Sequence, residues 1–197
     1  MRSLSTPRLL KTLESNPNNP PLCQAPDQAL KKPGLVLDEH ACDCHAHICG
    51  PAALYPYSPK RIYTPPDALL PQYRALLNHL GIERAVLVQP SIYADDNRAL
   101  LTALKEDPLH LRGIAVVDWE ISEQDLEKMH HAGIRGVRCN IVDLAEAKGV
   151  LPIMKLRYLA DKIAPLGWHI EFLMHVNEFP DLDQTLRNFP VPVVLGH

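Results

Sequence analysis

The segment Ala-Cys-Asp-Cys-His-Ala-His-Ile at residues 41–48 contains two histidines, His45 and His47, two positions apart. Because successive side chains of a β-strand point to opposite faces, the two imidazoles are predicted to share one face with Asp43. Paired imidazoles at the end of a strand can bind a metal ion, polarise a carbonyl group or transfer a proton. His197 ends another strand-like run, and it is the candidate third member of the same site.

Strand-like and helix-like runs alternate along the chain from residue 41 onward. The strands, largely apolar as expected for strands buried on both faces, are predicted at 41–48, 84–90, 111–118, 134–141, 168–175 and 191–197. Helical patterns with start and stop signals are predicted at 70–80, 95–106, 123–132, 152–166 and 181–189. This alternation indicates parallel strands joined by crossover connections, in either an open doubly wound sheet or a (β/α)8 barrel.

The loop after the first predicted strand favours the barrel. It lacks the glycine-rich phosphate loop of a nucleotide-binding Rossmann fold, and residues 52–66 instead form a long stretch rich in Tyr and Pro. Polar residues at the carboxyl ends of several strands are also typical of a TIM barrel. A complete barrel has eight strands in about 250 residues, whereas six strand-like runs are present here. We therefore expect an incomplete α/β barrel over 39–197, preceded by a Pro-rich flexible segment over 1–38.

The charge and hydropathy patterns give no sign of a nucleic-acid or membrane partner. Lys and Arg are scattered and the formal net charge is −3, so no basic stripe predicts binding to nucleic acid or to an anionic membrane. No apolar run approaches the roughly 18 to 20 residues of a membrane helix. The expected partner is a small-molecule substrate, and the oligomeric state is left open.

The five cysteines do not form a recognised motif. Their number is odd and no CxxC pair exists, so they are interpreted as buried free thiols in a reducing compartment. A zinc cluster of Cys42, Cys44 and Cys49 would lack a recognised spacing. Because the N-terminus also lacks the apolar region of a secretory signal, the cytoplasm is the expected location.

Polar residues at the predicted strand ends form the candidate site. Besides the three histidines they are Ser91 after the second strand, Asp118 after the third, Arg138 and Asn140 on the fourth, and Glu171 on the fifth. Any one of these is more readily explained as a cap or a solvated loop residue. Their placement at the same end of a parallel sheet favours one shared site.

The residue types indicate how such a site would act. Neutral imidazoles of His45, His47 and His197 can bind one divalent metal, whose water then attacks a carbonyl. Without a metal, the same imidazoles can donate hydrogen bonds to the carbonyl oxygen. The planar guanidinium of Arg138 suits a substrate carboxylate. No general base is evident, unless it is Glu171 or a residue beyond the end of this sequence.

The stretch from Ala41 to His197 resembles the amidohydrolase-related family, most closely its branch of 2-pyrone-4,6-dicarboxylate hydrolases and sugar lactonases. The matching pieces, in the family's order, are residues 42–51, 61–65, 96–98, 133–140 and 191–197, which read CDCHAHICGP, RIYTP, DNR, GIRGVRCN and VPVVLGH. The resemblance implies a (β/α)8 TIM-barrel-like fold of the metallo-dependent hydrolase type, truncated C-terminally with about six of eight βα units present. It also implies a hydrolase that opens a lactone or related cyclic ester of a carboxylated small molecule by water attack.

The resemblance also assigns roles to residues of this chain. His45, His47 and His197 would be catalytic, and they would be the ligands of a divalent metal such as zinc, which some members use and others do not need. The substrate contacts would be Tyr63, Ser91 and Arg138, to which the strand-end pattern adds Asn140 and Glu171.

Two departures from this branch bear on function. Leu144 and Leu173 stand where the pyrone-dicarboxylate enzymes have Arg and Tyr, which favours a different lactone. The family's catalytic Asp comes from the eighth strand, so this chain is expected to lack the residue that activates water, and whether it is active alone is left open. The alternatives are a non-catalytic remnant or interaction partner of full-length homologues, and a zinc-dependent decarboxylase of the wider superfamily.

Overall fold

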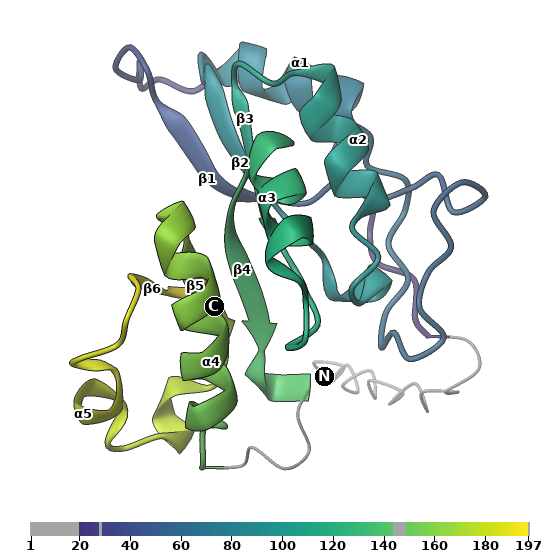
Figure 1. The fold of residues 1–197 in the computed structure, drawn as a ribbon. Coiled ribbons are helices and arrows are strands. Elements are labelled where there is room, and N and C mark those ends of the chain that lie inside the picture. Colours follow the sequence, from purple (N-terminus) through teal and green to yellow (C-terminus); the bar gives the residue numbers. More distant parts are fainter. Residues whose placement is uncertain (1–19, 28, 144–148, 197) are drawn as a thin grey trace, which may run out of the picture.

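The computed structural model describes residues 20–27, 29–143 and 149–196. His197 and Leu144 therefore lie outside the described residues. Within the described part, six parallel strands form one sheet in sequential order, β1-β2-β3-β4-β5-β6. The sheet curls into a half-barrel, and helices α1 to α4 lie along one side of it (Figure 1). The predicted incomplete barrel is confirmed.

The bounds of the elements agree closely with the periodicity of the sequence. The strands are β1 Cys42–Ala46, β2 Arg84–Val88, β3 Leu111–Ala115, β4 Ile134–Asn140, β5 His169–Leu173 and β6 Val193–Gly196. The helices are α1 Leu70–Leu80, α2 Arg98–Glu106, α3 Glu123–His131, α4 Ile153–Ile163 and α5 Leu182–Leu186, with 3-10 turns at Ser91–Tyr93, Ile141–Asp143, Ala164–Leu166 and Val176–Glu178. The largest differences are in α4 and α5, each of which is four residues shorter than the helix predicted at 152–166 or at 181–189.

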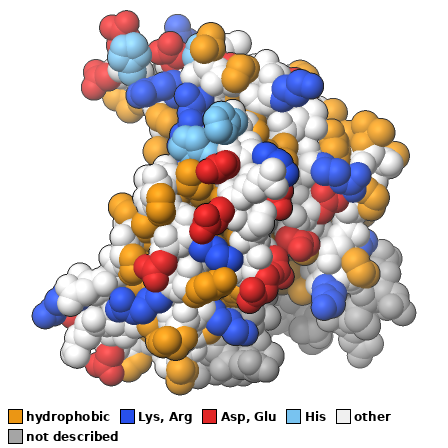
Figure 2. Space-filling model, in the orientation of Figure 1, with side chains coloured by type: hydrophobic (Ala, Val, Ile, Leu, Met, Phe, Trp, Pro, Cys, Tyr) orange, Lys and Arg blue, Asp and Glu red, His pale blue; other side chains and the backbone are white. Residues whose placement is uncertain are grey.

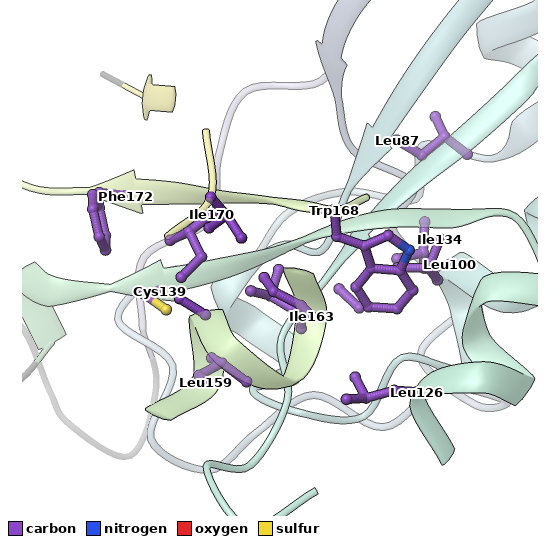
Figure 3. Packing of buried hydrophobic residues seen from close by; sticks show 14 of the residues in the cluster. Leu87, Leu100, Leu126, Ile134, Cys139, Leu159, Ile163, Trp168, Ile170 and Phe172 are labelled. Atoms are coloured by element: carbon purple, nitrogen blue, oxygen red, sulfur yellow. The ribbon is translucent and has the colours of Figure 1, made fainter. Parts of the chain in front are cut away.

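The hydrophobic core lies between the convex face of the sheet and the helices. Every second residue of a strand faces this layer, so β2 contributes Leu87 and β5 contributes Ile170 and Phe172 (Figure 3). The helices supply apolar side chains such as Leu159 and Ile163 of α4. The opposite, concave face carries the buried polar side chains of Arg138 on β4 and Glu171 on β5.

Trp168, immediately before β5, is fully buried in this core. Its indole Nε1–H donates a hydrogen bond of 2.9 Å to Nδ1 of His130 at the end of α3. A buried indole needs such an acceptor, because an unpaired donor in the core is costly. His130, which the helical pattern would place on an ordinary surface, therefore has a structural partner.

The shared face predicted for Asp43, His45 and His47 is wrong for Asp43. Asp43 pairs with Ala85 and Ala46 pairs with Leu87, so β1 contains one residue more than β2 over this stretch and forms a bulge. Asp43 accepts a hydrogen bond of 2.8 Å from the Tyr73 hydroxyl of α1. The bulge thus turns Asp43 toward the helices.

The cysteines differ from the prediction of buried thiols. Cys49 and Cys139 are buried, as predicted, but Cys23, Cys42 and Cys44 are exposed. Two of the exposed thiols lie on β1, which has a neighbouring strand on one side within the described sheet. An edge strand leaves side chains uncovered that a central strand would bury.

The segment before β1 contacts the long loop that follows β1. Residues 20–23 run beside this loop, where Cys23 N–H donates to the Thr64 carbonyl at 2.9 Å and Thr64 N–H donates to the Pro21 carbonyl at 2.8 Å.

Acidic and basic side chains are intermixed on the face seen in Figure 2. None of the described helices is long and apolar enough to cross a membrane.

Candidate functional site

The carboxyl ends of the parallel strands meet at one rim, which is where α/β barrels bind their ligands. A cavity of about 730 Å³ opens at the rim of β2, β3 and β4. Its lining includes the predicted residues Ser91, Asp118, Arg138 and Asn140, together with Lys60 and Arg61 from the long loop after β1. The structure therefore brings three of the predicted substrate contacts to one cavity.

Arg138 is held rigidly at this cavity. It lies on the concave face of β4, and its side chain is 4% exposed. One terminal nitrogen donates a hydrogen bond of 3.2 Å to the backbone carbonyl of Gln89, at the end of β2. Its Nε is 3.6 Å from Oε1 of Glu171, the register partner of Arg138 on β5. These contacts fix the plane of the guanidinium.

Glu171 lies between two cationic or basic groups. Its carboxylate faces Arg138 on one side and His45 on the other, where Oε2 is 3.6 Å from the imidazole Nδ1. The side chain is 3% exposed and is absent from the residues that line the cavity. The structure therefore places Glu171 against two other candidate residues, at a position away from the cavity wall.

His45 and His47 lie side by side at the end of β1. Their ring centroids are 5.0 Å apart and the rings are nearly perpendicular, at 82°. Nδ1 of His47 is 2.7 Å from the Val88 carbonyl oxygen. Because that oxygen can only accept, Nδ1 carries a proton. Nε2 then has the lone pair if the ring is neutral and a second proton if the ring is charged.

The two histidines do not lie on the wall of the cavity that Arg138 lines. Neither His45 nor His47 lines the cavity of about 730 Å³. His47 instead borders a second cavity of about 450 Å³, next to the beginning of α1 and the side chains of Asp67 and Tyr73. His45 is connected to Arg138 through Glu171, across the concave face of the sheet.

The Tyr63 phenol lies close enough to the cavity residue Ser91 and to Arg138 for both to affect its pKa. Burial raises the pKa of the Tyr63 phenol, whereas the Ser91 hydroxyl and the positive charge of Arg138 act in the opposite direction. The net pKa lies above the ordinary value of 10.0, so Tyr63 is protonated at neutral pH and can donate a hydrogen bond.

The described residues do not contain a complete set of metal ligands. His197 lies outside them, and within them no three His, Cys, Asp or Glu side chains are grouped to bind one ion. The Nδ1 hydrogen bond of His47 is of the kind that orients metal-binding imidazoles. Two imidazoles alone do not supply the three protein ligands of a catalytic zinc site. The described residues by themselves thus do not fit a catalytic metal.

Two buried polar residues that support the rim were not predicted as site residues. Gln89 is fully buried, and its side-chain amide donates to the Asp96 carbonyl at 2.9 Å. Asn97 donates to the Val116 carbonyl at 2.8 Å and accepts from Val116 N–H at 3.1 Å. These bonds tie the loop after β2 to the end of β3. A sequence signal exists only for Asn97, which belongs to the matching Asp-Asn-Arg piece.

Comparisons with known proteins agree with this architecture. The amidohydrolase family matches residues 42–197. A 2-pyrone-4,6-dicarboxylate hydrolase from Comamonas testosteroni is 39% identical over 166 residues, which are 84% of this chain and 54% of that protein. A 4-sulfomuconolactone hydrolase from Rhizobium radiobacter is 29% identical over 177 residues, which are 90% of this chain and 59% of that protein.

A solved structure from Acinetobacter baumannii, named as a probable 2-pyrone-4,6-dicarboxylic acid hydrolase with citric acid bound, superposes with a TM-score of 0.71. Its sequence is 26% identical, and the match covers 81% of this chain and 58% of that one. The chain thus spans a little over half the length of the relatives it matches. Because the family match extends over most of the sequence, the chain belongs to the amidohydrolase family.

Proposed function

We propose that this chain carries the carboxylate-binding and carbonyl-polarising part of a hydrolase that opens a lactone or a related cyclic ester of a carboxylated small molecule. The observation that carries the proposal is the rigid placement of Arg138 at a rim cavity. A guanidinium with a fixed plane binds both oxygens of a carboxylate. The relatives named above as hydrolases act on lactones that carry carboxylate or sulfonate groups, which supports the same class here.

In this proposal Arg138 binds the substrate carboxylate, and Ser91 and Asn140 orient the ring beside it. In this proposal the rings of His45 and His47 are protonated, so that Nε2 of each donates a hydrogen bond to the lactone carbonyl, whose oxygen becomes negative as water adds. The tetrahedral intermediate then breaks its bond to the ring oxygen, which leaves with a proton, and a second carboxylic acid is formed. The sum is one lactone and one water giving one ring-opened acid.

No general base is assigned among the described residues, because the carboxylate of Glu171 is engaged with Arg138 and His45. Amidohydrolases are often metal-dependent. A divalent metal such as zinc at His45, His47 and His197 stays a prediction, which metal analysis of the purified protein tests. The cytoplasm stays the proposed location, and a small-molecule substrate the proposed partner.

The experiment measures proton release by the purified 197-residue chain from 2-pyrone-4,6-dicarboxylate, from 4-sulfomuconolactone and from uncharged δ-valerolactone, with and without added zinc. Citrate binding is measured beside it by calorimetry. We expect opening of an anionic lactone, no opening of δ-valerolactone, and citrate binding that Arg138→Met abolishes. A chain that opens none of the anionic lactones and binds citrate no better than Arg138→Met would refute the proposal.

A further inference from the structure

We infer that Glu171 is a positioning residue, whose carboxylate fixes both the His45 imidazole and the Arg138 guanidinium and so sets the distance between the carbonyl-polarising and the carboxylate-binding ends of the site. This inference rests on the proposed function for the roles of those two ends. The juxtaposition itself is observed: Oε2 of Glu171 is 3.6 Å from Nδ1 of His45, and Oε1 is 3.6 Å from Nε of Arg138.

The three residues come from distant strands. Arg138 and Glu171 are register partners on the neighbouring strands β4 and β5. His45 lies on β1, which is separated from β5 by three strands in the sheet order. A contact between β1 and β5 is made only across the concave face, where the curl of the sheet brings them together. Glu171 is therefore the connection between the first strand and the fourth.

The burial of Glu171 makes this connection stiff. A carboxylate that is 3% exposed needs cationic or hydrogen-bonding partners, because an uncompensated buried charge is very costly. Space for it is left by Gly196 of β6, since a Cβ at that position would lie 3.1 Å from Oε1 of Glu171.

The orientation of both partners follows from these contacts. With Nδ1 of His45 turned toward Glu171, the opposite ring nitrogen Nε2 points away from the carboxylate. Arg138 is held by Glu171 through Nε and by the Gln89 carbonyl through a terminal nitrogen. Small displacements of groups that bind a reacting molecule are costly in rate, so a residue that fixes two of them has a large effect without touching substrate.

A direct catalytic role for Glu171 makes a different prediction. A general base must reach the attacking water, whereas Glu171 is buried and does not line the cavity of Arg138. Loss of a base would lower kcat and leave ligand binding unchanged. Loss of a positioning carboxylate changes the orientation of Arg138, so carboxylate affinity falls even in the absence of any reaction.

The test uses the 197-residue chain with Glu171→Gln, which keeps the shape and removes the charge. The matched control is Glu178→Gln, the same change at an exposed position just after β5. Citrate affinity is measured by calorimetry, the ring nitrogen signals of His45 by ¹⁵N NMR at fixed pH, and the fold by thermal melting. We expect Glu171→Gln to weaken citrate binding about tenfold, which is about 1.4 kcal/mol, and to shift the His45 signals. The control should change neither.

Wild-type citrate affinity together with unchanged His45 signals in a folded Glu171→Gln chain would overturn the inference. A fall in kcat alone would do the same, because it indicates a base. If Glu171→Gln does not fold, Glu171→Asp retains the charge on a shorter side chain and should lose affinity to a smaller extent; wild-type affinity there overturns the inference. If the wild-type chain does not bind citrate, the His45 signals alone decide the role of Glu171, and the proposed function fails only if the chain opens no anionic lactone either.

Discussion

His47 and Val88 are joined by a hydrogen bond of 2.7 Å between the imidazole Nδ1 and the backbone carbonyl of β2. This bond ties the end of β1 to the end of the neighbouring strand. It also requires a proton on Nδ1, so Nε2 is the ring nitrogen that remains to take part in a reaction.

Substitution of His47 by Asn should separate the two effects. The Asn amide can donate to the Val88 carbonyl from nearly the same position as Nδ1, but it provides no equivalent of Nε2. We expect a melting temperature close to that of the wild type and lactone opening reduced by about 10² to 10³. His47→Leu, which loses both, should also melt lower. Retention of activity by His47→Asn would show that Nε2 has no part in the reaction.

The buried pair of Arg138 and Glu171 should be strongly coupled in stability. Arg138→Met leaves a buried carboxylate without its Arg partner, and such changes cost about 3 to 5 kcal/mol. In Arg138→Met with Glu171→Met both charges are gone, so the loss should be less than the sum of the two single losses by more than about 1 kcal/mol. Urea unfolding of the wild type, the singles and the double variant measures this.

The control for that cycle is an exposed pair. Arg187 and Asp183 approach to 3.5 Å on the surface, with side chains 71% and 72% exposed. The same cycle with Arg187→Met and Asp183→Met should give a coupling below about 0.5 kcal/mol. Equal coupling in the two cycles would contradict the view that burial makes the pair at the site cooperative.

Lys60 should affect the binding of ligands that have more than one carboxylate. It lies at the exposed side of the cavity whose lining also includes Arg138. An exposed charge contributes at most about 1 kcal/mol, so Lys60→Ala should weaken citrate binding at most about fivefold. The effect should shrink at high salt and be absent for acetate. Lys105→Ala, at an exposed position on α2, is the control, and an equal loss there would rule out a specific contact.

The sequence allows the order and type of the elements to be predicted because each strand and helix has a local signal. Helix α1 is found at the predicted residues 70–80, since its apolar positions recur at helical spacing and Gly81 follows in the left-handed conformation, with φ of 74°. Helix α3 begins after Ser122, whose hydroxyl accepts from Asp125 N–H at 3.1 Å. Such features depend on residues within one turn of each other.

The contacts within the site could not be predicted in the same way. The bulge that turns Asp43 toward α1 changes the side-chain alternation on which the shared face was based. The contact of His45 with Glu171 depends on the curvature of the whole sheet, which no local pattern encodes. Sequence spacing placed Glu171 among the substrate contacts, but it could not show that a neighbouring Arg and a distant His would enclose its carboxylate.

The cysteines should divide into two groups in the native chain. Burial raises the pKa of the Cys49 thiol to about 11 and that of Cys139 to about 12. At pH 8 only about one Cys49 thiol in a thousand is then ionised, and the thiolate is the reactive form. We expect iodoacetamide to label the exposed Cys23, Cys42 and Cys44 much faster, as measured by peptide mass spectrometry. Labelling of Cys139 at a similar rate would contradict the packing of β4 against the helices.

The hydrogen bond between Trp168 and His130 should make stability dependent on pH. Burial, followed by the charges of Arg135 and His131, lowers the pKa of His130 below its ordinary value of 6.5. Burial also lowers the pKa of His169. The unfolded chain therefore binds protons at these histidines more tightly than the folded chain does. Their contribution to the free energy of unfolding is fully present above about pH 6.5 and is lost as the pH falls below that value.

Protonation of Nδ1 removes the acceptor of the Trp168 indole, so the loss through His130 should be about 1 kcal/mol. Urea midpoints at pH 7.5 and 5.5, followed by tryptophan fluorescence, measure the effect. In His130→Asn the side-chain oxygen can still accept from the indole but does not titrate, so the difference between the two midpoints should become smaller. If the difference between the two urea midpoints is as large in His130→Asn as in the wild type, the acid sensitivity comes from other groups. His169 is then the next residue to substitute, because its pKa is lowered as well.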